Sequence, residues 1–201
     1  METVTFGRYW QQDDNQKTPI EWDVVTKDNE KCLLVSHYAL DAKTFDDEMD
    51  TTRWALSSLK RWLNSSFFSH AFTEEEQAFI LQIPHEIDFI ETGTEKVFLL
   101  SLEEAEKYYP RPKKRICIAS QHTRNALHST NNDAWVNSDG SCFWWLRDLG
   151  DGDLNVSYVG IDGEIHGSGI FAAATGFCVR PAVWIPLDTA LCPLGINNIV
   201  R

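Results

Sequence analysis

The segment from residue 148 to residue 155 carries the side chains whose spacing comes nearest to a metal-binding loop. Asp151, Asp153 and Asn155 alternate along the chain, which places oxygen ligands at the intervals found in calcium-binding loops. Asp162 falls where a twelfth ligand would lie, but Val156 occupies the sixth position, where such loops need glycine. The same spacing also suits a polar turn whose side chains bond their own backbone. Calcium binding is therefore an alternative to a simple turn.

Covalent catalysis would need an activated nucleophile with a base in reach. Cys142 and Cys178 lie inside apolar runs, where a reactive thiolate is disfavoured. Ser168 does not have the flanking glycine spacing of a nucleophile elbow. The histidines of the C-terminal half belong to no catalytic pattern: His122, His128 and His166. We therefore name no catalytic residue and expect a protein that is not an enzyme.

Composition indicates one globular domain. The chain has 201 residues, 43% of them hydrophobic and eight of them Trp, which is enough for one sizeable core. We place this domain at residues 1–186 and a C-terminal tail at residues 187–201. The formal charge of −12 argues against binding of nucleic acid, and the short basic run at residues 111–115 is interpreted as a solvated loop.

Other classes are excluded by simple patterns. The N-terminal residues lack the basic and apolar regions of a signal peptide, and no apolar run is long enough to cross a membrane. The five cysteines are odd in number and widely spaced, which favours free thiols in a reducing compartment. No cysteine or histidine spacing matches a zinc site.

Two aromatic runs must position any site near the C-terminus. Residues 142–147 and residues 176–185 are short, apolar runs bounded by Gly or Asp, typical of buried strands, and we expect them to pair. Trp144, Trp145 and Trp184 are expected to anchor one core between them. Each run contains one arginine, Arg147 or Arg180, which needs a carboxylate or carbonyl partner.

The remaining elements follow from local signals. Residues 20–24 alternate as a half-buried strand and pair in a hairpin with residues 31–36, whereas the acidic segment 41–52 is interpreted as a solvated loop. Apolar spacing predicts a helix that begins near residue 55 and ends at residues 64–66. Capping boxes start helices at Thr73 and Ser101, and a short helix is expected over residues 120–128. Asp162-Gly163 predicts a type I′ hairpin turn.

Several blocks occur in an order that resembles a known family. They are Phe6-Gly7-Arg8-Tyr9, Ile20-Glu21-Trp22, the block at 33–41, Trp62-Leu63-Asn64 with Ala71-Phe72, Phe98-Leu99-Leu100-Ser101, Trp144-Trp145-Leu146-Arg147 and Val179-Arg180-Pro181-Ala182-Val183-Trp184. Over residues 4–186 they resemble a domain-of-unknown-function family of Firmicutes and their phages. That family is similar to the C-type-lectin-like superfamily, with formylglycine-generating enzymes and the variable proteins of diversity-generating retroelements among its relatives. One departure is Asp148-Leu149-Gly150, where the family often has Ser-Pro-Gly.

The resemblance implies a fold and a region for binding. The fold would be α+β and C-type-lectin-like, with small, twisted, mostly antiparallel sheets, flanking helices and a long irregular region. Relatives display ligand-contacting side chains on that region, here residues 131–171, and its aromatic and amide side chains suit recognition. The expected ligand-binding residues are Asn131, Asn132, Trp135, Asn137, Asp139, Tyr158 and His166.

The residue patterns and the resemblance together set the expected partners and alternatives. We expect a protein or carbohydrate ligand, no nucleic acid or membrane partner, no cofactor except possible calcium at Asp151, Asp153 and Asn155, and a location in the cytoplasm or a phage particle. An enzyme of the formylglycine-generating type would need a close cysteine pair, for which Cys142 and Cys178 are the candidates.

Overall fold

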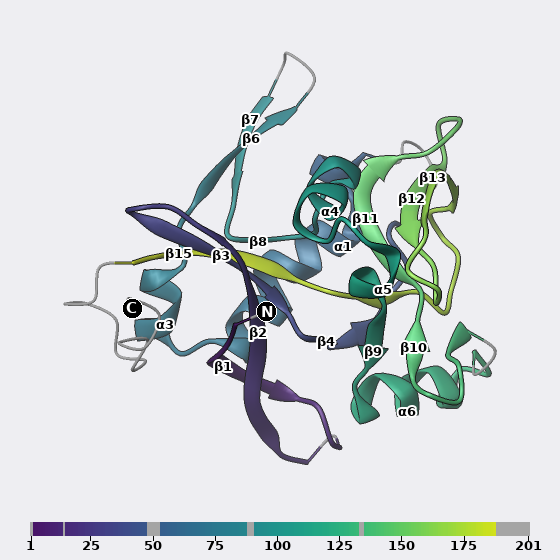
Figure 1. Ribbon diagram of the computed structural model, residues 1–201, viewed down its shortest axis with the longest axis horizontal. Helices are drawn as coiled ribbons and strands as arrows, with labels where there is room; N and C mark the ends of the chain where they lie inside the picture. Colours follow the sequence, from purple (N-terminus) through teal and green to yellow (C-terminus); the bar gives the residue numbers. More distant parts are fainter. Residues whose placement is uncertain (1, 14, 48–52, 88–90, 133–134, 188–201) are drawn as a thin grey trace.

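The computed structural model describes residues 2–13, 15–47, 53–87, 91–132 and 135–187 as an α+β fold of small sheets and short helices (Figure 1). The strands form four sheets within these residues, and most strand pairs are antiparallel. The predicted α+β class with small, mostly antiparallel sheets is therefore confirmed. The proposed tail lies outside the described residues except for Leu187, whose amide donates to the carbonyl of Glu30.

The first sheet has the strand order β1-β2-β3-β15-β8. Its strands are β1 (Thr3–Trp10), β2 (Lys17–Lys27), β3 (Lys31–Ser36), β15 (Ala182–Pro186) and β8 (Val97–Phe98). The expected hairpin of β2 with β3 is confirmed, and Ile20 and Trp22 of β2 are fully buried. Alternation of apolar residues therefore identified the inward face at Ile20 and Trp22, whereas Val24 is half-buried and Asp23 is buried.

A second five-stranded sheet, which we call sheet C, has the order β13-β12-β11-β14-β5. Its strands are β13 (Ile165–Phe171), β12 (Asn155–Val159), β11 (Trp144–Leu149), β14 (Cys178–Val179) and β5 (Asp41–Ala42). The smaller sheets contain β10 (Ser141–Cys142), β9 (Cys117–Ala119) and β4 (Tyr38–Ala39), and β6 (Ile83–Ile87) with β7 (Glu91–Glu95).

The second aromatic run is not one strand, as we had expected. Trp144 of β11 pairs in parallel with Cys178 of β14, but Trp184 of β15 pairs with Leu33 in the first sheet. The run divides at Arg180-Pro181, because proline cannot donate to a strand ladder. The chain thus passes from sheet C into the first sheet along the yellow-green ribbon across the centre of Figure 1.

One apolar core nevertheless joins the two sheets. Trp144 and Trp145 are fully buried, whereas Trp184 is half-buried at the margin of the core with the Lys31 ammonium over its ring. The expectation that three tryptophans anchor the core is therefore correct for two of them. Trp144 and Trp145 donate to the carbonyl oxygens of Arg115 and Lys43, which satisfies their indole N–H groups.

The helix predicted to end at residues 64–66 continues through them. A short 3₁₀ turn (η1, Trp54–Leu56) precedes α1 (Ser58–Trp62), a π-helical turn (η2, Leu63–Phe67) and α2 (Phe68–Ala71). Asn64 lies in the π turn, where its side chain accepts from the amides of Lys96 and Val97 and donates to the carbonyl of Val97. The polar residue expected to end the helix instead fixes β8 against it.

The other helices begin largely as predicted. Both capping boxes are confirmed, at Thr73 before α3 (Glu74–Phe79) and at Ser101 before α4 (Leu102–Tyr108). Ser120 caps α6 (Gln121–Ser129). The basic run is not a solvated loop, because α5 (Pro112–Arg115) forms there and the buried Arg115 donates to the carbonyls of Tyr109 and Gly163. No described helix is long and apolar enough to cross a membrane.

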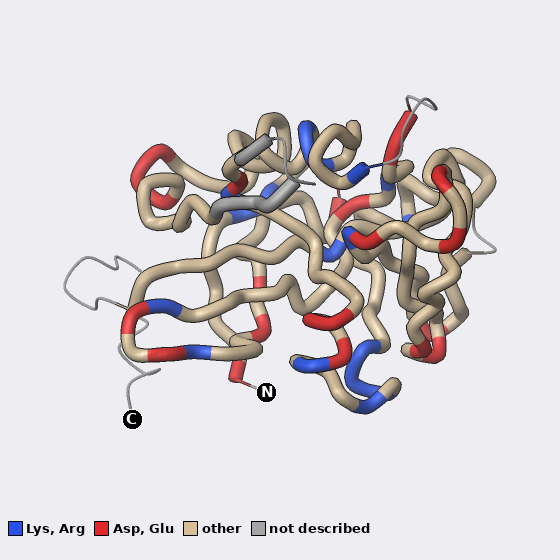
Figure 2. Tube along the Cα trace, turned by 90° about the horizontal axis from the view of Figure 1, so that it is seen from above, with Lys and Arg blue, Asp and Glu red and all other residues tan. Residues whose placement is uncertain are grey.

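Two loop interpretations also change. The amide of Gly160 donates to the carbonyl of Glu164, so this hydrogen bond closes a turn of three residues rather than two between β12 and β13, with Gly163 at φ +81°. In the acidic segment, Asp41 and Asp46 are buried, and Asp41 accepts from the Tyr9 hydroxyl at 2.8 Å. Residues 48–52 of that segment lie outside the described residues. Acidic residues are otherwise spread over loops on several sides of the molecule (Figure 2).

Both strand arginines have the partners that burial requires. Arg147 donates to the carbonyl of Leu99 and to the carboxylate of Glu104. Arg180 is 2% exposed, and it donates to the carbonyl of Ser36 and, at 3.0 Å, to the carboxylate of Asp23. The predicted carboxylate and carbonyl partners are therefore confirmed for both side chains.

Candidate functional site

A cluster of aromatic rings lies where sheet C meets the segment before β10. Trp135 and Phe143 contact each other at 5.4 Å between ring centroids, and the buried ring of Phe177 contacts both. Tyr158 contacts Phe143 and Phe177 at 6.0 and 5.0 Å. The cluster thus joins rings from three separate parts of the chain over one patch of the core.

The outer edge of this cluster is a stacked pair of side chains. Tyr158 of β12 and His166 of β13 are direct cross-strand neighbours, and their rings are nearly parallel with centroids 4.6 Å apart. Both residues are half-buried. We use the name ring face for the half-buried members of the cluster: Trp135, Phe143, Tyr158 and His166.

The Tyr158 hydroxyl is available for an external contact. Partial burial and, to a smaller extent, the Asp162 carboxylate raise the pKa of Tyr158, so the hydroxyl stays protonated at neutral pH. It has no hydrogen-bond partner among the described residues. A rigid ring with a free donor at its tip is a feature common in binding surfaces.

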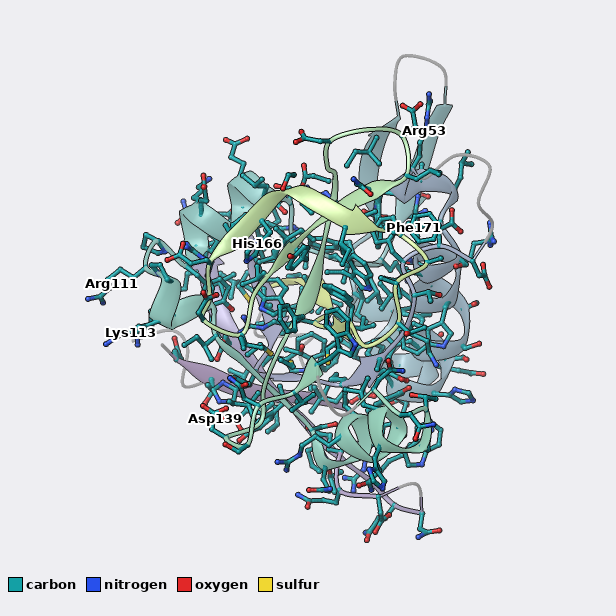
Figure 3. All side chains as sticks on the ribbon, turned by 90° about the vertical axis from the view of Figure 1, so that its right-hand side faces the viewer. Arg53, Arg111, Lys113, Asp139, His166 and Phe171 are labelled. Carbon is teal, nitrogen blue, oxygen red and sulfur yellow. The ribbon has the colours of Figure 1, made fainter. Side chains whose placement is uncertain are left out.

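The edge strand β13 extends this face. Figure 3 shows His166 and Phe171 on β13, which crosses the front of the molecule in that view. Phe171 is 39% exposed, which is unusual for a large apolar side chain in this protein. As the outermost strand of sheet C, β13 offers both side chains and backbone groups to a partner.

Trp135 is held in place by a glycine. A Cβ atom at Gly176 would lie 2.3 Å from the indole ring, and Gly176 has a φ of +92°. Only glycine accepts both the left-handed backbone and the contact without strain. Gly176 therefore fixes the position of the largest ring on the ring face.

The predicted amide residues have mainly local roles. Asn131, at φ +58°, ends α6, and the Asn132 side chain accepts from Thr175 next to Gly176. Asn137 and Asp139 form a tight turn before β10, where both bond Ser141. Figure 3 shows Asp139 well apart from His166. Among the predicted ligand-binding residues, the structure therefore brings together Trp135, Tyr158 and His166, with Asn132 at their border, and separates Asn137 and Asp139 from them.

Asp139 illustrates this local use of side chains. Hydrogen bonds from the Ser141 amide and hydroxyl hold the pKa of the Asp139 carboxyl below its usual value. The carboxylate is thus engaged by its own turn, as is typical of an Asx turn.

The proposed calcium ligands are also arranged as a turn. The Asn155 amide group donates to the backbone carbonyl of Asp151, and the Asp151 amide donates to Ser168. Asp153 is exposed. Within the described residues there is no group of three or more His, Cys, Asp or Glu side chains that could hold a metal ion. The geometry favours the polar-turn interpretation of Asp151, Asp153 and Asn155.

The thiols are enclosed by the core. Cys32, Cys117, Cys142 and Cys178 are all buried, whereas Cys192 lies outside the described residues. Burial raises the pKa of Cys117 well above its usual value. A closed, apolar environment of this kind disfavours the thiolate that an oxidase would need.

Sequence reasoning missed Phe143 and Phe171 as parts of this surface, and Phe177 as the buried ring beneath it. Phe143 and Phe177 belong to the aromatic runs that were assigned wholly to the core. The signal that could have found Phe143 is its position between Cys142 and Trp144 in an extended apolar run, since alternate residues point to opposite faces.

Comparison with known proteins places the chain in a family but gives it no activity. The family described as "Domain of unknown function (DUF6273)" matches residues 29–187, so the chain belongs to that family. No curated protein and no solved structure matches the chain.

Proposed function

Because family membership supplies no activity, we propose from the geometry that this domain is a non-catalytic recognition module of a bacterial or phage protein, with a C-type-lectin-like architecture. Its ligand is a protein or a carbohydrate, bound on the ring face. The sequence resemblance and the small, mostly antiparallel sheets support the architecture.

The observation that carries this proposal is the stacked pair of Tyr158 and His166. Stacking at 4.6 Å makes the two rings one rigid, half-exposed platform, which loses little conformational entropy when a ligand binds. Sugar rings and peptide side chains both pack on such platforms, and the free Tyr158 hydroxyl adds a directional hydrogen bond.

The proposal is tested with a glycan array and with purified partners recovered by affinity capture. Tyr158→Ala is expected to weaken binding about tenfold or more, since it removes the central ring of the platform. Tyr158→Phe isolates the hydroxyl. Phe68→Ala, which truncates a half-buried ring on α2 outside sheet C, serves as the matched control and should bind normally.

The decisive test of recognition through the ring face removes both rings of the stacked pair. A folded Tyr158→Ala, His166→Ala double variant that binds the same ligands as the wild-type protein would contradict recognition through the ring face.

A further inference from the structure

A pocket of about 430 Å³ lies away from the ring face, between the β1–β2 hairpin and the N-terminal end of α6. In Figure 1 both elements lie at the lower side of the molecule. The His122 amide donates to the carbonyl of Gln11, which ties the helix to the hairpin, and the Ser120 amide donates to Ala39. The walls are therefore connected by backbone hydrogen bonds across the pocket.

Arg124 supplies the positive charge of this pocket. Its Nη2 donates to the Gln121 side chain at 2.9 Å, but its Nε is buried and has no hydrogen-bond partner. No described carboxylate forms a salt bridge with it. A buried N–H group without an acceptor costs free energy, so the charge of Arg124 is only partly satisfied within the protein, and this residue lines the pocket.

The guanidinium rests on a bare stretch of backbone. A Cβ atom at Gly140 would lie 3.4 Å from Arg124 Nη1 and 3.0 Å from Ile118. Gly140 also has a φ of +88°, so the position favours glycine. A Cβ atom there would therefore meet the guanidinium at van der Waals distance, and the tighter contact at this position is with Ile118.

Acceptor groups line the rest of the pocket. The Gln11 amide nitrogen donates to Thr18 and to the carbonyl of Pro19, which leaves its oxygen to accept from a ligand. Glu21 also lines the pocket, is half-buried and forms no salt bridge with a described residue. The half-buried ring of Tyr38 completes this wall.

These groups define a ligand with one carboxylate and several hydroxyls. The guanidinium matches a carboxylate, Glu21 and Gln11 match hydroxyl donors, and the Tyr38 ring can pack against a sugar ring. A volume of 430 Å³ suits one or two sugar units, within the range of small-molecule pockets. We infer that this pocket is a second binding site, independent of the ring face, for a small sugar acid whose carboxylate is held by Arg124.

The inference is tested by calorimetric titration of the whole domain with glucuronate and galacturonate, beside neutral glucose and galactose. Both acids should bind, and the neutral sugars should bind roughly tenfold more weakly or not at all. Arg124→Gln should weaken binding of the acids by about ten- to hundredfold, whereas Arg124→Lys should retain part of it because the charge remains.

Arg111→Gln is the matched control, because it removes an exposed arginine outside the pocket and should leave binding unchanged. Circular dichroism confirms that each variant is folded. Failure of both acids to bind at millimolar concentration would overturn the inference. Neutral sugars that bind as tightly as the acids would also overturn it, as would unaltered binding of the acids to folded Arg124→Gln. Binding of amino acids where the sugar acids do not bind would overturn the assignment of the ligand class. Loss of ring-face binding in Tyr158→Ala leaves this result unaffected, so the two proposals fail separately.

Discussion

Arg180 and Arg124 each keep a side-chain nitrogen without a hydrogen-bond partner, yet they lie in opposite surroundings. Arg180 is in the core, where its guanidinium lies 4.7 Å from the Tyr109 ring centroid and 5.1 Å from that of Trp144. Arg124 lies at the wall of a pocket, with one amide oxygen as its partner.

The difference shows how surroundings separate structural arginines from binding ones. Around Arg180, aromatic faces and the Asp23 carboxylate compensate the buried charge. Burial lowers the pKa of Arg180, but its electrostatic interactions with Tyr109, Cys117 and Asp23 together raise that pKa by more than burial lowers it. The pKa therefore lies above its usual value, and the side chain stays charged. The charge of Arg124 is only partly compensated within the protein, and its side chain lines a pocket. For these two reasons we assign it a ligand.

The largest expected effect concerns access to the core region beside Arg180. Because Cys117, Cys142 and Cys178 are buried, and the pKa of Cys117 and Cys142 is raised well above the usual value, alkylation in the native state should require unfolding. Labelling should be slower by a factor of roughly a thousand or more than in denaturant, as measured by mass spectrometry of the peptides. Rapid, selective labelling of native Cys142 or Cys178 would instead support the oxidase alternative.

The next effect is on stability. Arg180→Met should lower the free energy of unfolding by about 3–5 kcal/mol, because it removes the buried guanidinium that pairs with the Asp23 carboxylate. Chemical denaturation measures the change. The double variant Asp23→Asn, Arg180→Met should recover part of the loss, and a single-variant loss below about 1 kcal/mol would remove the distinction between the two arginines.

Substitution of Arg147 should lower the free energy of unfolding by less than substitution of Arg180 and by more than substitution of Arg124. It is half-buried and bonds both Glu104 and the carbonyl of Leu99, so Arg147→Gln should cost about 1–3 kcal/mol. A double-mutant cycle with Glu104→Gln isolates the pair, and a coupling energy near zero would show that the carbonyl contact alone matters.

The smallest effect on stability is expected at Arg124. Arg124→Gln should change the free energy of unfolding by no more than about 0.5 kcal/mol, since its partner is an exposed amide. A loss comparable with that of Arg180→Met would make Arg124 a structural residue and weaken the case for the pocket.

Local sequence signals predicted much of the fold. The rest is determined by long-range contacts, which the sequence patterns do not reveal. The capping boxes at Thr73 and Ser101 and the hairpin of β2 with β3 depend on neighbouring residues, so their patterns were sufficient. The need of Arg147 and Arg180 for partners followed from burial alone. By contrast, the division at Pro181 decides between two sheets, and only the folded chain determines which strand each half joins.

The sites were less accessible to sequence reasoning. Tyr158 and His166 were both named, but their stacking depends on the strand register. The Arg124 pocket joins Gln11, Glu21 and Tyr38 to a helix about a hundred residues later, and no local pattern brings them together. Arg124 itself sits in a helix predicted correctly, where its side chain gave no sign of a ligand.

The most direct test follows the Arg124 side chain itself. In ¹⁵N-labelled protein, titration with galacturonate should shift the Nε–H resonance of Arg124 and the amides of Gln11, Glu21, Tyr38 and Gln121, while galactose leaves them in place. Resonances of Arg180 and of sheet C should not move. An Arg124 resonance that galacturonate leaves unchanged at saturating concentration would contradict the assignment of this pocket as a binding site.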